Sequence, residues 1–176
     1  MMIKLISLIE NRILVPRRSP EERIKNLDNF TSRKISQYIK NGSKGDLVLD
    51  DTSVTSLPEG LIVQGNLSLR ETQIKQLPEG LKVGGSLYLF KTPIISIPQN
   101  LKVGKDLNLM KTQITELPQG VDIGGALILH STLINKLPKD LKVKYFIDLG
   151  NTPLSRKYTP EQIKEMVPEV VGSIKV

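Results

Sequence analysis

The chain has 176 residues, no cysteine, a single histidine and a formal net charge of +7. A chain of this length is normally one domain with its own core, and the lack of cysteine excludes disulfides, thiolate metal sites and cysteine nucleophiles. No apolar run approaches the roughly 18 residues that a bilayer-spanning helix needs, so we expect no membrane span.

Residues 2–14 have apolar side chains at the spacing of one helical face, and Pro16 would end that helix. Lys4 and Glu10 interrupt the apolar run, and no small-residue cleavage site follows it. The segment therefore does not have the pattern of a cleaved export signal.

A second helix is expected to start at Ser19, which is followed by Pro20 and, three residues after this N-cap, by Glu22. Its apolar stripe continues, with an expected kink near residues 31–32, to a stop at Asn41-Gly42. The two helices make residues 1–44 a basic helical cap, because the first repeat of an array would otherwise expose its core.

Residues 45–154 repeat with a period of 20 residues, without insertion or deletion. Each unit has the form Leu-x-Leu-x-x-Thr-x-Ile-x-x-Leu-Pro-x-x-Leu-x-Val, with conservative replacements. Leu-x-Leu and Leu-x-Val have the period of a strand, and about twenty residues leave no room for a helix. We therefore predict a β-solenoid with two narrow sheets of short parallel strands, built from five full repeats and a partial sixth.

Two corners join the strands of each repeat. After each Leu-Pro step comes a residue that tolerates a left-handed backbone, namely Gly60, Gly80, Asn100, Gly120 or Asp140. The second corner carries glycines that also tolerate a wide range of φ, at Gly65, Gly84, Gly85, Gly104, Gly124 and Gly125. The column Thr52, Thr72, Thr92, Thr112, Thr132 and Thr152 predicts hydroxyls paired with backbone groups, since a buried unpaired one would cost roughly 1–3 kcal/mol.

The C-terminal residues 155–176 predict a second cap. A sixth unit begins at residues 150–154, but no Leu-Pro step follows, and Thr159-Pro160 instead marks the start of a helix. Residues 170–176 fit either a further strand or a tail. The helical residues expected to cover the last repeat are Ile163, Met166 and Val167.

On this motif, the chain resembles bacterial and bacteriophage leucine-rich repeat proteins of the shortest class. It is similar to the repeat domains of type III secreted effectors, whose units also pass through Leu-Pro and lack a helix. The resemblance covers residues 45–154 and implies a leucine-rich repeat β-solenoid. Here Thr replaces the usual Asn of the ladder and a second Leu-Pro step is missing. Some secreted relatives carry a ubiquitin-ligase domain with a Cys nucleophile, and this cysteine-free chain cannot share that activity.

Catalysis needs clustered chemical groups, and this chain offers one histidine and scattered carboxylates. His130 has Asn108 and Asp148 at neighbouring strand positions but no candidate nucleophile, so we expect a surface histidine. The paired glycines at the corners are not phosphate loops, because no helix follows them. We expect no enzymatic activity, no metal site and no cofactor.

Recognition of a partner is the default function of a solenoid, and the outward strand positions indicate where it could occur. Apolar side chains gather there on consecutive rungs about 4.8 Å apart, with basic residues at the rim, which is typical of an interface. The expected partner-binding residues are Arg70, Tyr88, Phe90, Lys91, Met110, Lys111, Ile128 and His130. The competing hypothesis is that the N-terminal segment, a crystal neighbour or a second copy of the chain covers this face.

The basic N-terminal cap favours a second function, because residues 1–44 carry ten basic and four acidic side chains. Such a patch would attract nucleic acid or an anionic surface, although the aromatic residues there belong to the buried stripe and are not free for base stacking. The residues expected to form this patch are Arg17, Arg18, Arg23, Arg33, Lys34 and Lys40.

Lysines also follow the outward positions of the other sheet, a pattern more typical of solubility than of a ligand site. We expect a monomer in the cytoplasm of a bacterial or phage-infected cell, with an unidentified protein partner and with export into a host left open. A purely structural or self-assembling role is a third hypothesis.

Overall fold

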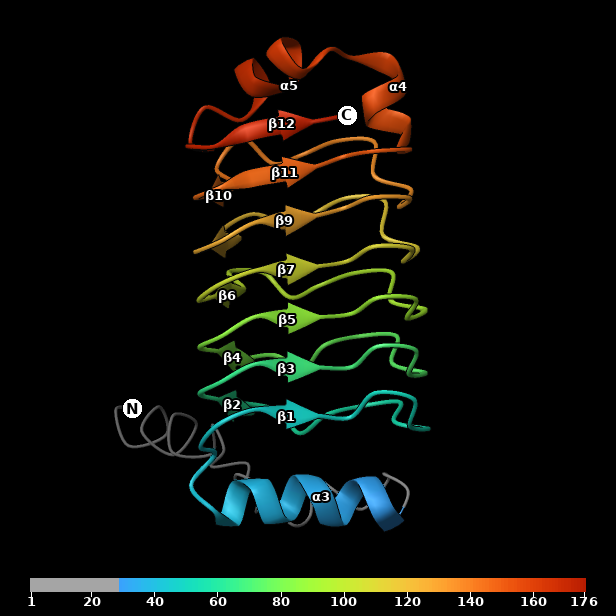
Figure 1. Ribbon diagram of the computed structural model, residues 1–176, viewed down its shortest axis with the longest axis vertical. Helices are drawn as coiled ribbons and strands as arrows, with labels where there is room; N and C mark the ends of the chain where they lie inside the picture. The colour runs from blue at the N-terminus through green and yellow to red at the C-terminus, as the bar shows by residue number, and fades with distance from the viewer. Residues whose placement is uncertain (1–28) are drawn as a thin grey trace, which may run out of the picture.

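The computed structural model describes residues 29–176, which form a β-solenoid whose repeats stack along one axis (Figure 1). Helix α3 (Asn29–Lys40) lies at one end of the stack, and helices α4 (Pro153–Lys157) and α5 (Pro160–Met166) lie at the other. The expected helix over residues 2–14 and the start at Ser19 lie outside the described residues.

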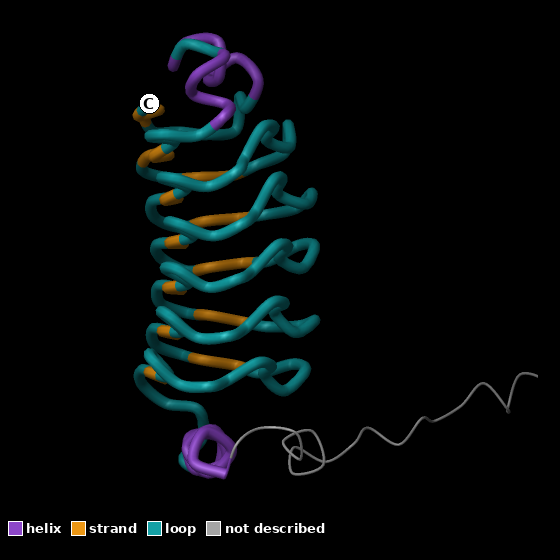
Figure 2. Tube along the Cα trace, turned by 90° about the vertical axis from the view of Figure 1, so that its right-hand side faces the viewer, coloured by secondary structure: helices purple, strands orange, loops and turns teal. Residues whose placement is uncertain are grey.

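Two parallel sheets form neighbouring sides of the solenoid (Figure 2). The first sheet has seven strands, β1 (Leu47–Val48), β3 (Leu67–Ser68), β5 (Leu87–Tyr88), β7 (Leu107–Asn108), β9 (Leu127–Ile128), β11 (Phe146–Asp148) and β12 (Ser173–Lys175). The second sheet has five strands, β2 (Ile62–Val63), β4 (Lys82–Val83), β6 (Lys102–Val103), β8 (Asp122–Ile123) and β10 (Lys142–Val143).

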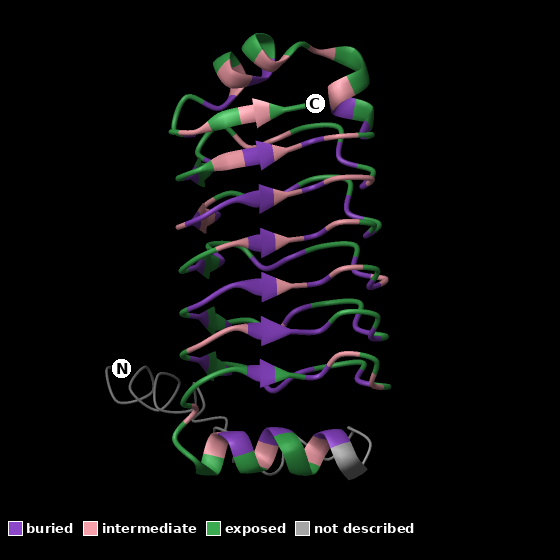
Figure 3. Ribbon diagram, viewed as in Figure 1, coloured by how far each residue is buried: buried purple, intermediate pink, exposed green. Residues whose placement is uncertain are grey.

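The strand register follows the sequence period. Pairing between repeats joins residues 20 positions apart, as in Leu47 with Leu67 on the first sheet and Val63 with Val83 on the second. The inward side chains of both sheets enter one continuous core, and Leu67, Leu87 and Leu107 have no exposed surface. Buried segments recur along the strands of the first sheet through the whole stack (Figure 3). Burial of each such side chain contributes about 1.5–3 kcal/mol, so the stacked columns hold the repeats together. The predicted two-sheet solenoid is confirmed.

The threonine column satisfies its hydroxyls within its own repeat. Each hydroxyl donates to the carbonyl oxygen three residues earlier, at 2.7–2.8 Å, as in Thr72 to Leu69 and Thr112 to Leu109. Among the described residues no buried side-chain nitrogen or oxygen lacks a partner. The predicted pairing of these hydroxyls with the backbone is therefore confirmed.

A left-handed bend precedes each of these threonines, and the sequence did not reveal it. Its residues have φ between 54° and 57° although none is glycine: Asp51, Glu71, Lys91, Lys111, Ser131 and Asn151. The first five donate their backbone N–H to the carbonyl of the next repeat, as Lys91 does to Met110 at 3.1 Å. Bonds between repeats therefore stabilise a conformation that Glu and Lys rarely adopt.

The corner after Leu-Pro is left-handed at four of the five expected positions. Gly60, Gly80, Asn100 and Gly120 have positive φ, whereas Asp140 is not among the residues with a left-handed backbone. The Asp140 carboxylate instead accepts the N–H of Gly120 at 2.8 Å. The Asp140 side chain therefore provides the hydrogen-bond acceptor for a backbone N–H of the preceding repeat.

At the second corner the glycines do not use their freedom in φ for a left-handed backbone. None of the six corner glycines has a positive φ. They are needed because successive repeats approach too closely for a Cβ, and one on Gly104 would overlap the carbonyl oxygen of Gly84. Close backbone approach, rather than backbone freedom, selects glycine here.

A side-chain ladder runs beside these glycines along the stack. Asp46, Asn66, Ser86 and Asp106 each accept the backbone N–H of the residue 20 positions later, at 2.7–3.2 Å. A Cβ on Gly85 would overlap the Asn66 Oδ1 atom. The larger corner residues Lys105 and Tyr145 follow repeats that carry the smaller Ser86 and Ala126. The ladder residue thus determines how large a side chain the next corner tolerates.

The N-terminal cap packs through the predicted apolar stripe of α3. Ile35 and Tyr38 are buried, and the Tyr38 hydroxyl lies within hydrogen-bonding distance of two carbonyl oxygens, those of Ser43 at 2.7 Å and Gly45 at 2.9 Å. Burial raises the pKa of Tyr38. The helix ends at Lys40 and Gly42 has φ 77°, which confirms the predicted stop.

The C-terminal cap confirms the helix predicted at Thr159, whose side chain forms a capping box with Gln162. Ile163 and Val167 are fully buried against the last repeat. The structure shows two further features of this cap that the sequence did not predict. Thr152, the last residue of the threonine column, also caps the short helix α4. Strand β12 pairs with β11 and so extends the first sheet.

The corner ladder predicts a compensating pair of substitutions. Gly85→Ala should lower the free energy of unfolding by roughly 1–3 kcal/mol, because the added methyl group overpacks the corner. Adding Asn66→Ser should recover part of this loss by shortening the side chain that the methyl group meets. Urea denaturation followed by circular dichroism measures both, and Lys105→Ala is the control, expected within about 0.5 kcal/mol of the unchanged protein. No recovery with Asn66→Ser would contradict this account of the corner.

The ladder also predicts a shifted carboxyl group. The pKa of Asp46 lies below its ordinary 3.8 because the carboxylate accepts the backbone N–H and the side-chain amide of Asn66. The ionised Asp46 carboxylate therefore stabilises the folded state at pH values above the ordinary pKa, and this stabilisation is lost as the pH falls through the lower pKa of the folded state. In an NMR titration, Asn66→Ala should raise the pKa of Asp46 only part of the way, since the backbone donor remains. An unchanged value would show that the amide contributes nothing.

Candidate functional site

The expected interaction residues lie together on the outer side of the first sheet. We call Tyr88, Phe90, Met110, Ile128 and His130 the apolar strand face. Tyr88 and Ile128 end strands β5 and β9 and are separated by one rung, since both are in register with Asn108 of β7. The other three residues, Phe90, Met110 and His130, each lie two positions after the last residue of β5, β7 and β9. With rungs about 4.8 Å apart, the five side chains cover three consecutive strands.

These side chains are half-buried rather than fully exposed. The sequence predicted that they would point at solvent, and each does lie on the outer face. Neighbouring side chains on rungs about 4.8 Å apart shield one another, which reduces their exposure. The most exposed apolar residues of the repeats lie elsewhere, for example Ile95 at 54% and Leu133 at 53%.

The basic residues at the rim of this face, Arg70, Lys91 and Lys111, contact its aromatic rings. The Arg70 guanidinium lies 4.4 Å from the centre of the Tyr88 ring, while the amines of Lys91 and Lys111 lie 5.2 Å and 5.7 Å from that of Phe90. Each cation–π contact contributes about 0.5–1 kcal/mol at an exposed site. The contacts hold the rings in place, so the face is preorganised.

Two of the three rim cations also pair with acids of the preceding repeat. Arg70 lies 3.8 Å from Asp50, and Lys91 lies 3.4 Å from Glu71. Such exposed pairs contribute little, about 0–1 kcal/mol. Lys111 has no ion pair within the described residues, so its charge remains available to a partner.

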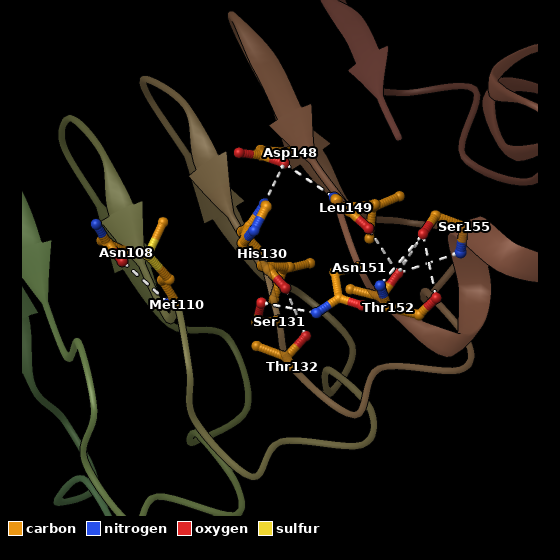
Figure 4. A network of polar contacts seen from close by, with 12 residues as sticks. Asn108, Met110, His130, Ser131, Thr132, Asp148, Leu149, Asn151, Thr152 and Ser155 are labelled. Carbon is orange, nitrogen blue, oxygen red and sulfur yellow. Dashed lines mark hydrogen bonds and ion pairs between the residues drawn. The ribbon is translucent and has the colours of Figure 1, made fainter.

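His130 lies beside Asp148, as its strand position suggests (Figure 4). Its Nδ1 is 3.5 Å from the Asp148 carboxylate, which also accepts the N–H of Gly150 at 2.9 Å. A Cβ on Gly150 would lie 2.5 Å from the same nitrogen, so glycine leaves room for the ring. No hydroxyl in the described part of the chain is hydrogen-bonded to His130. The pair therefore positions the ring at the edge of the apolar strand face.

The predicted basic patch is described only in part. Arg33, Lys34 and Lys40 are exposed on α3, and this helix contains no acidic residue. Arg17, Arg18 and Arg23 lie outside the described residues. Within residues 29–176 no group of three or more His, Cys, Asp or Glu side chains could hold a metal ion, and no helix is both long and apolar enough to cross a membrane.

A second surface feature escaped the sequence analysis. An open groove of about 960 Å³ lies over strands β2, β4, β6 and β8 of the second sheet. Ile62, Lys82 and Lys102 line it, together with backbone of the corner glycines. The periodic lysines could have indicated it, but the groove itself depends on how the side chains are arranged in space.

Comparison with known proteins adds no relative: no protein-family model, no curated protein and no solved structure matches this chain. The stacked 20-residue repeats agree with a short leucine-rich repeat solenoid. A bacterial or bacteriophage origin and a relation to secreted effectors stay predictions from the sequence motif.

Proposed function

We propose that this chain is a non-enzymatic protein-binding module whose partner contacts the apolar strand face. The observation that carries the proposal is the adjacency of Tyr88, Phe90, Met110 and Ile128 on three consecutive strands, with Lys111 at the rim. An apolar centre with a charged rim is the usual composition of a protein interface.

The rigidity of the surface supports the same proposal. Ring and cation contacts hold Tyr88 and Phe90 before a partner arrives, which lowers the conformational entropy lost on binding. A stable interface needs about 20–30 residues from each protein, so the partner would extend beyond this face onto adjoining rungs. We place this activity in the cytoplasm of a bacterial or phage-infected cell.

The test replaces the centre of the face. Phe90→Asp combined with Met110→Asp should abolish capture of the partner in a pull-down from the native cell, because two buried charges would enter the interface. The matched control is Ile95→Asp with Leu133→Asp, which adds the same charges at apolar positions away from the face. The partner should be retained by the control and lost by the face variant, with unchanged circular dichroism for both. Equal capture by both would refute the assignment.

A second candidate function rests on α3. Its exposed Arg33, Lys34 and Lys40 have no acidic residue on the same helix to neutralise them. A basic end of the solenoid would bind the phosphate backbone of nucleic acid without reading its sequence. The proposal is weaker than the first because Tyr38, the aromatic residue of α3 within the described range 31–40, is buried and is not free for base stacking.

Salt dependence tests this second candidate. Binding to duplex DNA should weaken by about 10³-fold or more between 50 and 200 mM salt if about six phosphates are neutralised. Reversing the charges with Arg33→Glu, Lys34→Glu and Lys40→Glu should remove the binding, whereas the Phe90 and Met110 variant should retain it. Fluorescence anisotropy measures both, and a flat salt response or absent binding at low salt would exclude this function.

A further inference from the structure

The groove on the second sheet has a floor of bare backbone. The outward positions of the strands form one row, Ile62, Lys82, Lys102, Asp122 and Lys142. The outward positions two residues later form a parallel row, Gln64, Gly84, Gly104, Gly124 and Lys144. The glycines are required by the close stacking of the repeats, and as a result no side chain fills the middle of this second row. The groove is therefore open to a ligand lying along the stack.

The described residues that line the groove include two cations, Lys82 and Lys102, and one acid, Asp122, which is in register with Lys102 but not with Lys82. Lys82 and Lys102 are direct neighbours in the strand register and both are exposed. Like charges side by side on a sheet are destabilising. Elsewhere, cations pair with an acid exactly one repeat earlier, as Lys91 does with Glu71 and Lys136 with Glu116. No carboxylate of the described chain lies within 4 Å of Lys82 or Lys102.

We propose that this groove binds an acidic peptide segment of another protein, in an extended conformation, with one carboxylate shared between Lys82 and Lys102. The shared carboxylate would neutralise the repulsion between the two amines. The amide side chains of Gln99 and Asn100, which also line the groove, can hydrogen-bond to the peptide backbone. The site lies on a different side of the solenoid from the apolar strand face and does not depend on the function proposed there.

The spacing of the rungs specifies the sequence of the peptide. Side chains on one face of an extended peptide recur about every 6.8 Å, whereas the rungs recur about every 4.8 Å. A side chain placed over Ile62 is therefore followed by one between Lys82 and Lys102, the next near Asp122 and the next near Lys142. The complementary order along one face of the peptide is apolar, acidic, basic, acidic.

A peptide fits the groove better than single-stranded nucleic acid. Binding of single strands without sequence preference combines basic residues with aromatic rings on which the bases stack. No aromatic side chain lines this groove, whereas Ile62 offers an apolar contact and is 48% exposed. The lining therefore suits a chain with mixed side chains and few bulky rings.

The experiment uses the full chain and the capped peptide Leu-Ser-Glu-Ser-Lys-Ser-Glu, labelled for fluorescence anisotropy at low salt. Saturable binding is expected, and Lys82→Glu with Lys102→Glu should weaken it by about ten-fold or more because attraction becomes repulsion. The matched control, Lys75→Glu with Lys157→Glu, changes the net charge equally at exposed positions outside both proposed binding surfaces and should leave the affinity within about two-fold. A peptide with Lys in place of the first Glu should bind more tightly to the charge-reversed protein, Lys82→Glu with Lys102→Glu, than to the unchanged protein.

Several outcomes would overturn the proposal. These are no saturable binding to the unchanged protein, equal binding by the charge-reversed variant, and equal binding of a peptide with its Lys and first Glu exchanged. Tighter binding of oligothymidylate that depends on the same lysines would assign the groove to nucleic acid. If charge reversal prevents folding, Lys82→Gln with Lys102→Gln removes the repulsion between the two amines and should fold, with a smaller but measurable loss of peptide affinity because only the attraction is removed. A negative result in this experiment would leave the test of the apolar strand face unaffected, because Lys82 and Lys102 do not belong to that face.

Discussion

Successive repeats are joined by parallel backbone hydrogen bonds, and this bonding keeps each residue directly over its counterpart 20 positions earlier. Neighbouring strands in a sheet lie about 4.8 Å apart, so every side chain has its own predecessor as nearest neighbour. An identical apolar residue is then a good neighbour, because it continues the core. An identical charge is a poor neighbour, and a Cβ at the close corner is tolerated only where the preceding repeat leaves room for it, as at Lys105.

The corners show how this constraint acts on residue choice. Gly85 follows a repeat in which Asn66 accepts a backbone N–H, whereas Lys105 follows one in which the shorter Ser86 does the same. The departure from glycine at position 105 therefore has its cause one repeat earlier. The left-handed bends at Lys91 and Lys111 follow the same rule, because the N–H of each bonds to the next repeat and stabilises an unfavourable φ.

Function is expected where the constraint is weakest, at outward positions whose side chains need not match. On the first sheet the change from Ser68 to Tyr88 brings an aromatic ring beneath the Arg70 cation and begins the apolar strand face. On the second sheet, the adjacent Lys82 and Lys102 lie beside a floor of backbone. The caps close the two ends of the core, so the sides of the solenoid carry the candidate binding surfaces.

The sequence alone determined the period, the two parallel sheets, the inward columns, the paired threonine hydroxyls and the helix at Thr159, since each follows from the spacing of residue types along the chain. It also placed Phe90 and Met110 on one outer face, because register makes residues 20 apart neighbours. Other features needed the tertiary structure: the reason for Gly104, the φ of Lys91, the ring contacts of Arg70 and the groove beside Lys82 and Lys102. Each of these depends on the distance between neighbouring repeats or on where side chains turn in space, and a linear pattern contains neither quantity.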